Sequence, residues 1–361
     1  MKALLNRARF ANRSKLALLM ASAAFSSTFA ATAQAQQFYK LESAVTMKSS
    51  GPDWDYITFE PARSYLYIAR RHEGATVYDT KAKKVVGTIE NSQDANATAL
   101  VQEFDRGFTI NEDGTVTLFQ LSTLKPISRI KLGKAADTGI YEPVTKQVAV
   151  MLGDEKQIVF LDPKTGSLLH KLQMDSVKLE APTPDGEGNL FIGQRDKNSV
   201  ARVDAKQHKV TAEWKIEGCE QPSGLAVDRA NKRIFVGCRG KNPVLAVMDS
   251  ESGKVVATPE IGRGNDGVVY DPEAHKVYAS NGVDANLVIY DQIGPDTYKL
   301  SQATTTRPYA RTMALDPKTK SVYLVTAEGT FDPAEKSGGP ASFYPNKYFP
   351  DTFTVLTYSA K

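Results

Sequence analysis

Short apolar runs recur along the chain from about residue 57 to the C-terminus, and polar turn residues separate them. Residues 65–69, 189–192 and 233–236 are examples, and they are rich in Val, Ile, Leu, Tyr and Phe, which favour strands. No stretch keeps a helical period over four turns. The pattern therefore predicts a chain that is nearly all-β.

The strands belong to a repeat. An acidic residue, often followed by Pro, closes a short strand at a period in the low forties, and the carboxylate can bond turn amides while Pro ends the strand. The seven anchors are Glu60, Asp105, Glu142, Asp185, Asp228, Asp271 and Asp316, with spacings of 45, 37, 43, 43, 43 and 45 residues. Each anchor precedes a second strand, a third that often ends in Asp, and a fourth. This pattern predicts a seven-bladed β-propeller with four antiparallel strands per blade.

The last unit is short of one strand. Its three expected strands lie near residues 311–315, 321–325 and 353–358, after which the chain ends. Residues 39–43 echo residues 298–301, which form the outer strand of the sixth unit. We therefore expect residues 38–46 to complete blade 7, which joins both ends of the chain in one sheet and protects its edges.

Blade 7 also carries a long loop at residues 327–352, between its second and third strands. Loops of this length in compact repeat proteins are usually either functional or disordered. The aromatic residues Phe343, Tyr344, Tyr348 and Phe349 argue against simple disorder, and we expect the loop to cover the face on which the other such loops open.

The first 35 residues have the pattern of a secretory signal peptide. Five basic residues precede the apolar stretch 16–24, and Ala33-Gln34-Ala35 is a small-x-small cleavage signal. The full chain has 45 basic and 41 acidic residues, so removal of residues 1–35 leaves 40 basic against 41 acidic. We expect cleavage after Ala35, a single propeller domain at residues 36–361, a periplasmic location and no membrane anchor. Near-neutral charge and export make nucleic acid an unlikely partner.

The periodic strand–Asp-Pro–strand pattern, strand endings such as Val77-Tyr78-Asp79, and the Pro-rich loop before Phe353-Thr354-Val355-Leu356 identify a resemblance. The mature chain resembles the YVTN-type (YncE-like) family of exported seven-bladed β-propellers. The family's tetrapeptide occurs in relaxed form at residues 67–70 and 278–281. The resemblance implies an exported propeller, and it brings no catalytic residues to carry over.

The first strand of each propeller blade lines the central channel, so residues five before each anchor should form a ring at its mouth. These residues are Asp55, Leu100, Asp137, Glu180, Ser223, Asp266 and Arg311. Converging carboxylates raise one another's pKa unless a positive charge offsets them. Asp55, Asp137, Glu180 and Asp266 are therefore candidate ligands for a divalent cation such as Ca²⁺, with Arg311 as a partial offset. The alternative is that these carboxylates cap turns at the strand starts.

Basic and aromatic residues are expected on the same face. Loops after the second strands, and the segment before blade 7, contribute Arg70, Arg71, His72, Arg195, Arg239 and Arg307, while Trp54 and Tyr309 flank the ring. With Arg311, these residues form a candidate pocket for a small anionic or zwitterionic ligand. The alternative is that the arginines pair with the ring acids.

The two cysteines, Cys219 and Cys238, lie in the loop before blade 5 and at the end of its second strand. Both positions should face the channel mouth, and an even cysteine count in an exported chain favours a disulfide. No Cys-x-x-Cys spacing indicates a metal or redox site.

Two functional hypotheses remain. The first is a monomeric, exported binding or scaffold protein without catalytic residues, which holds a small polar ligand or a protein partner over the channel. The second is a metal-dependent, lactonase-like hydrolase in which the ring carboxylates hold a cation that activates water. The predicted ring contains no Asn, which counts against the second hypothesis.

Overall fold

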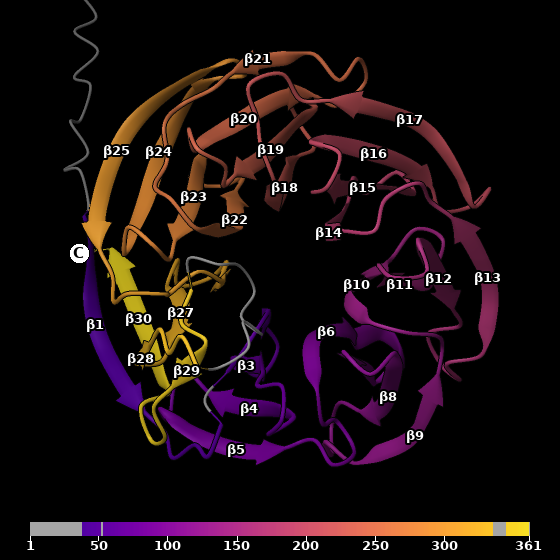
Figure 1. The fold of residues 1–361 in the computed structure, drawn as a ribbon. Coiled ribbons are helices and arrows are strands. Elements are labelled where there is room, and N and C mark those ends of the chain that lie inside the picture. The colour runs from indigo at the N-terminus through magenta and orange to yellow at the C-terminus, as the bar shows by residue number, and fades with distance from the viewer. Residues whose placement is uncertain (1–37, 52, 335–343, 361) are drawn as a thin grey trace, which may run out of the picture. The chain divides into compact units, whose positions relative to one another are not determined.

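The computed structural model describes residues 38–360 except 52 and 335–343, so the predicted signal peptide lies outside the described residues. Within the described residues, the chain forms seven four-stranded antiparallel sheets arranged in a ring, in sequence order (Figure 1). One short 3-10 helix, η1 (Gln102–Phe104), interrupts the β-structure. The predicted all-β, seven-bladed propeller is confirmed.

The first four blades each use four consecutive strands. Blade 1 comprises β2 (Ile57–Glu60), β3 (Tyr65–Ala69), β4 (Ala75–Asp79) and β5 (Lys84–Thr88). Blade 2 comprises β6 (Ala95–Val101), β7 (Arg106–Asn111), β8 (Thr115–Gln120) and β9 (Pro126–Lys131). Blade 3 comprises β10 (Ala136–Glu142), β11 (Gln147–Leu152), β12 (Gln157–Leu161) and β13 (Leu168–Gln173). Blade 4 comprises β14 (Leu179–Pro184), β15 (Asn189–Gln194), β16 (Ser199–Asp204) and β17 (Lys209–Lys215).

Blades 5 and 6 repeat this order, and blade 7 departs from it. Blade 5 comprises β18 (Pro222–Asp228), β19 (Arg233–Cys238), β20 (Val244–Asp249) and β21 (Val255–Ala257). Blade 6 comprises β22 (Asn265–Asp271), β23 (Lys276–Asn281), β24 (Asn286–Gly294) and β25 (Thr297–Thr305). Blade 7 comprises β26 (Met313–Leu315), β27 (Val322–Thr326), β30 (Thr354–Ala360) and β1 (Tyr39–Thr46), and β28 (Gly329–Thr330) pairs with β29 (Lys347–Tyr348) in its long loop.

Blade 7 closes the ring with strands from both ends of the chain. Its order is β26-β27-β30-β1, and β1 pairs with β30 from Tyr39 opposite Ala360 to Thr46 opposite Thr354. Tyr39 also reaches the neighbouring blade, because its hydroxyl lies 2.8 Å from that of Tyr278 on β23. The predicted closure by an N-terminal strand is confirmed.

The core consists of seven apolar clusters, one between each pair of neighbouring blades in the described residues. Strand β3 shows why its sequence is continuously apolar rather than alternating. Successive side chains of a strand point to opposite faces. Leu66 and Ile68 pack toward blade 7, whereas Tyr67 and Ala69 pack toward blade 2. An inner strand is therefore buried on both faces.

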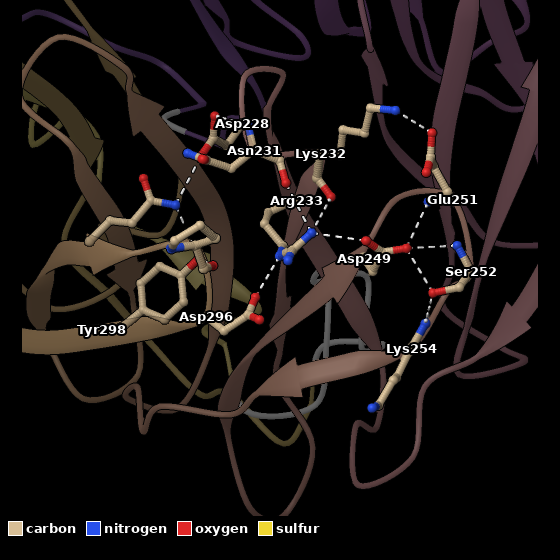
Figure 2. Close-up of polar contacts among 12 residues, drawn as sticks. Asp228, Asn231, Lys232, Arg233, Asp249, Glu251, Ser252, Lys254, Asp296 and Tyr298 are labelled. Carbon is tan, nitrogen blue, oxygen red and sulfur yellow. Dashed lines mark hydrogen bonds and ion pairs between the residues drawn. The ribbon is translucent and has the colours of Figure 1, made fainter. Parts of the chain in front are cut away.

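Acidic residues at strand ends organise the turns. At seven strand ends in the described residues, a carboxylate accepts hydrogen bonds from the backbone amides two and three residues ahead, at Asp79, Glu142, Asp162, Asp204, Asp228, Asp249 and Asp271. One oxygen accepts both bonds except at Glu142, where each oxygen accepts one. Figure 2 shows Asp249 bonded to Ser252 and to Arg233, while Arg233 also reaches Asp296 in blade 6. The turn-capping role expected of the anchors is confirmed at Glu142, Asp228 and Asp271.

Replacing Asp249 with alanine should lower the free energy of unfolding by about 2 kcal/mol, because two backbone amides and Arg233 lose an acceptor. Urea denaturation monitored by circular dichroism measures the change. Asp296→Ala is the matched control, since Asp296 pairs with the same arginine but is half exposed and accepts no turn-amide hydrogen bond within the described part of the chain. We expect it to cost less than about 1 kcal/mol. Equal losses in the two variants would contradict the capping role.

Candidate functional site

The central channel holds two cavities that share Tyr56 and Asp266. The first, here named the mouth cavity, has a volume of about 210 Å³. Blades 1 to 6 all contribute to its wall. The lining residues that lie in the first strands or directly before them are Asp55, Tyr56, Asn96, Ala136, Asp137, Glu180 and Asp266. The second cavity has a volume of about 550 Å³, is mostly apolar and is lined by the first strands of all seven blades. Charged side chains therefore gather at one end of the channel.

Of the seven predicted ring residues, Asp55, Asp137, Glu180 and Asp266 line the mouth cavity, whereas Leu100, Ser223 and Arg311 do not. In blade 2 the predicted register is wrong. Leu100 lines the second cavity, and Asn96 takes the blade 2 position in the mouth cavity. The cause is η1, which inserts one turn between the end of β6 and Asp105, so the anchor lies about four residues later than in the other blades. The ring therefore does contain an asparagine, contrary to the prediction.

Three arginines from the loops after the second strands pair with the ring acids. Arg71 lies 2.7 Å from Asp55, Arg195 lies 2.7 Å from Glu180, and Arg239 lies 3.0 Å from Asp266. Each distance joins a guanidinium nitrogen to a carboxylate oxygen. The sequence left open whether the loop arginines bind a ligand or pair with the ring acids. These three arginines pair with the ring acids.

Arg311 is fully buried and sits between two aromatic rings. Its guanidinium carbon lies 4.7 Å from the ring centre of Trp54 and 5.1 Å from that of Tyr344, which comes from the long loop of blade 7. Arg311 also contacts Asp266 at 3.3 Å and donates to the carbonyl of Trp54. Trp54 is itself completely buried. Both residues were predicted to touch a ligand, and the structure places them behind the cavity wall, where they hold Asp266 and the loop.

The other predicted ligand residues lie outside the mouth cavity. Arg70 is buried over the ring of Phe353 and pairs with Glu73. The side chain of His72 is 79% exposed, and Arg307 is exposed with a 3.4 Å contact to the hydroxyl of Thr354. Tyr309 packs edge-on against Tyr344. The structure therefore brings together the ring acids with Arg71, Arg195 and Arg239, and leaves these four residues apart from them.

Neighbouring charges divide the ring acids into two kinds. Burial raises the pKa of Asp137, and the nearby Glu180 and Asp55 carboxylates raise it further, well above its usual range. Burial also raises the pKa of Asp55 to about 7, although Arg71 and Arg311 oppose the shift. For Asp266, burial favours a higher pKa, but Arg239 and Arg311 outweigh it and the pKa is lowered. Asp266 thus favours its ionised form. Asp137 is the ring carboxyl whose negative charge is least offset by neighbouring positive charges.

Three residues of the site were missed by sequence reasoning. Tyr56 follows Asp55 and donates its hydroxyl to Glu180 across the channel at 2.8 Å. Asn96 was hidden by the displaced anchor, although the spacings of 45 and 37 residues on either side of Asp105 carried the signal. Tyr344 was expected as one of four loop aromatics, but no local pattern singled it out as the residue that donates to the carbonyl of Gly264, at 2.7 Å.

The predicted disulfide is present. Cys219 and Cys238 are bonded, with Cα atoms 5.3 Å apart, and they join the segment before β18 to the end of β19. Cys238 directly precedes Arg239, so the bond lies beside a residue that lines the mouth cavity. A disulfide indicates an oxidising compartment. No helix among the described residues has the length and apolar character needed to cross a membrane.

The predicted metal ligands share one cavity but do not form a coordination set. Among the described residues, no three His, Cys, Asp or Glu side chains come close enough together to hold a metal ion. Three of the four predicted carboxylates already face arginines. The donor set therefore does not fit Ca²⁺, which takes six to eight oxygen ligands.

Comparisons with known proteins agree with the architecture. No protein-family model matches the chain. The chain is 25% identical over 179 residues to the protein named YncE of Escherichia coli O157:H7, covering 44% of this chain and 50% of that protein. YncE proteins of Salmonella typhi and Salmonella typhimurium are 26% identical over the same coverage. The chain thus spans about half the length of the curated relatives it matches. This distant homology supports the resemblance to YncE-like propellers.

Solved structures share the fold. A chain of Kuenenia stuttgartiensis hydrazine synthase has a TM-score of 0.67 and 18% identity, and covers 78% of this chain and 94% of its own. A chain from the crystal structure of the mitotic checkpoint complex has a TM-score of 0.67 and 12% identity, with 89% and 94% coverage. At these identities the likeness concerns the fold alone.

Proposed function

We propose that this seven-bladed propeller, a distant homologue of the YncE proteins, is an exported binding protein that holds a small polar ligand in the mouth cavity. One observation carries the proposal. Six blades place charged and polar side chains around a single concave space of about 210 Å³ at one end of an otherwise apolar channel. Concave sites with a few converging polar groups are the usual form of small-molecule sites.

The construction of the cavity wall favours binding over catalysis. Arg195, Arg239 and Arg71 are fixed by ion pairs with the ring acids, which preorganises the wall before any ligand arrives. A rigid, preformed site loses little freedom on binding. The long loop adds Tyr344, which is buried against Arg311 and fixes the loop beside the channel.

Export to the periplasm is part of the proposal. The Cys219–Cys238 disulfide supports an oxidising compartment, and the expected signal peptide at residues 1–35 supplies the route. The expected cleavage after Ala35 lies outside the described residues.

The lactonase-like hydrolase is the weaker alternative. Asn96 now joins Asp55, Asp137, Glu180 and Asp266 around one cavity, and this observation favours it. The arginine partners of three of these carboxylates count against it, because guanidinium groups take the place that a divalent cation would need. We therefore retain binding as the function and use Ca²⁺ as a competing probe below.

Filling the mouth cavity should abolish ligand binding. Protein purified from the periplasm is examined by native mass spectrometry for a retained small molecule, and by NMR for chemical-shift changes at the cavity on addition of small polar probes. Asp137→Tyr fills the cavity, and we expect it to weaken binding at least tenfold.

Leu100→Tyr is the matched control, because Leu100 lines the second cavity at the other end of the channel. We expect binding to survive in this variant. Equal loss in both variants, or probes that perturb only the outer blade edges, would reject the mouth cavity as the binding site.

A further inference from the structure

We infer that the mouth cavity binds a small primary ammonium ion, and that Asp137 and Asn96 receive its N–H groups. This inference rests on the proposed function, because it names the chemical class of ligand for the same cavity. It departs from the anionic ligand that the sequence suggests, since the arginines behind that expectation are already paired with carboxylates.

Acidic side chains outnumber basic side chains in the cavity wall. Six acidic residues line it, Asp55, Glu112, Asp137, Asp154, Glu180 and Asp266, against four basic residues, Arg71, Lys178, Arg195 and Arg239. The three arginines form ion pairs with Asp55, Glu180 and Asp266. An anion would enter a space that already has too few positive charges, whereas a cation would restore the balance.

Asp137 is the carboxylate that lacks a cationic partner. Among the described residues, no lysine, arginine or histidine forms an ion pair with it, and it accepts a hydrogen bond from the Asn96 side-chain amide at 3.5 Å. Burial and the neighbouring Glu180 and Asp55 carboxylates raise its pKa well above the usual range. A positive ligand beside Asp137 would remove this penalty.

Asn96 supplies an independent observation. Its side chain is 2% exposed, lines the cavity and carries a buried Oδ1 atom without a hydrogen-bond partner. The orientation of the amide follows from its Nδ2 group, which donates to the Ala136 carbonyl at 3.3 Å and to Asp137 at 3.5 Å. Oδ1 is therefore an acceptor that needs a donor from outside the protein.

The two residues together select the chemistry. A primary ammonium group carries three N–H donors and a full positive charge, so one such group can satisfy both the Asn96 oxygen and the Asp137 carboxylate. A quaternary ammonium ion has the charge but no N–H donor. The volume of about 210 Å³ corresponds to roughly seven water molecules at about 30 Å³ each. This volume limits the ligand to a short-chain amine.

Isothermal titration calorimetry at constant ionic strength tests the inference with four probes: ethylammonium, tetramethylammonium, acetate and Ca²⁺. We expect ethylammonium to bind at least tenfold more tightly than the other three. Asp137→Asn should weaken ethylammonium binding at least tenfold, and it keeps the shape of the side chain. Asn96→Ala should weaken it about fivefold through the loss of one acceptor.

Asp154→Asn is the matched control. Asp154 also lines the cavity, but it is exposed. The substitution removes the same charge as Asp137→Asn and leaves Asn96 in place. We expect less than a threefold effect. Equal weakening by Asp137→Asn and Asp154→Asn would show a general electrostatic field rather than a built ammonium site, and would overturn the inference.

Acidification should weaken the binding of ethylammonium. The charged and titratable groups that act on Asp137 and Asp55 are Glu180, Asp266, Tyr56, Arg71, Arg195 and, behind the cavity wall, Arg311. The pKa of Asp55 is raised to about 7, so this carboxyl takes up a proton as the pH falls from 8.5 to 5.5, and the pKa of Asp137 is raised as well. A protonated carboxyl is neutral and no longer attracts a cation by its charge. The affinity for ethylammonium should therefore fall as the pH falls, and binding should release protons. Affinity that rises on acidification would overturn the inference.

The remaining outcomes separate the two proposals. Tight binding of acetate with none of ethylammonium would overturn the ammonium inference and keep the mouth cavity as a ligand site. Tighter binding of Ca²⁺ than of ethylammonium, lost in Asp137→Asn, would overturn it in favour of the metal site. Failure of every probe to bind, together with no retained small molecule in native mass spectrometry, would overturn both proposals.

Discussion

Replacing Arg311 with methionine is expected to lower the free energy of unfolding by about 3–5 kcal/mol, the cost typical of removing one partner from a buried ion pair. Arg311 is completely buried, and its Nε atom lies 3.3 Å from Asp266. Burial alone favours a higher pKa for Asp266, and Arg311 is one of the two arginines that hold it low. Without Arg311, Arg239 is left as the ion-pair partner of this buried carboxylate in the described residues, and Arg195 acts on it from farther away.

Loss of packing adds to the loss of charge. The guanidinium of Arg311 lies against the rings of Trp54 and Tyr344, and such contacts are worth about 0.5–2 kcal/mol each when they are desolvated. Tyr344 belongs to the loop after β27, whereas Trp54 precedes β2, so one side chain joins blade 7 to blade 1 and to the loop. Methionine fills part of the volume but offers no charge and no donor.

Urea denaturation, followed by tryptophan fluorescence and by circular dichroism, measures the effect. Arg307→Met is the matched control, since Arg307 is exposed and its guanidinium contacts the hydroxyl of Thr354 at 3.4 Å. We expect the control to change stability by less than about 0.5 kcal/mol. A variant Arg311→Met as stable as the parent would mean that the buried cluster tolerates an apolar replacement, as some buried ion pairs do.

The fold was predictable because the residues that mark its repeat are required by local interactions in each turn. Asp228 and Asp271 bond the amides of the turns that follow them, so the same residue type recurs wherever the same turn recurs. Closure of the ring was predictable from the missing strand of blade 7 and from the echo between residues 39–43 and 298–301. Each of these signals is short in range or repeats along the chain.

The site was only partly predictable, because its pairings depend on which side chains meet across the channel. Counting back from each anchor placed Asp55, Asp137, Glu180 and Asp266 correctly around the mouth cavity. The same count failed in blade 2, where η1 displaces Asp105 from the end of β6. The correct residue there is Asn96, which is central to the ammonium inference.

Burial was the second obstacle. Arg311 and Arg239 are the same residue type in neighbouring parts of one predicted pocket, yet Arg239 lines the mouth cavity and Arg311 lies behind it. What separates them is the aromatic packing of Trp54 and Tyr344 around Arg311. Tyr344 belongs to a loop that has no counterpart in the other blades. The repeat therefore gave no indication that its side chain would pack against Arg311.

Removing the disulfide by replacing both Cys219 and Cys238 with alanine is expected to lower the free energy of unfolding by about 3 kcal/mol. The bond closes a loop with a sequence separation of 19 residues, and the loop-entropy relation gives this figure for a loop of that length. Alanine is chosen because both sulfurs are buried, and serine would leave hydroxyl groups in an apolar cluster. Guanidinium denaturation with and without dithiothreitol measures the loss.

The same pair of substitutions should also reach the mouth cavity, and this consequence distinguishes the disulfide from a simple stability device. Arg239 follows Cys238 directly and lines the cavity, while its backbone amide donates to Gln221 on the other arm of the closed loop. We expect the double variant to bind its ligand less tightly, because the loop that presents Arg239 to Asp266 gains freedom. Dithiothreitol should reproduce both effects in the parent protein and leave the double variant unchanged. A parent protein whose stability and binding are insensitive to dithiothreitol, after reduction is verified by thiol alkylation, would contradict this role.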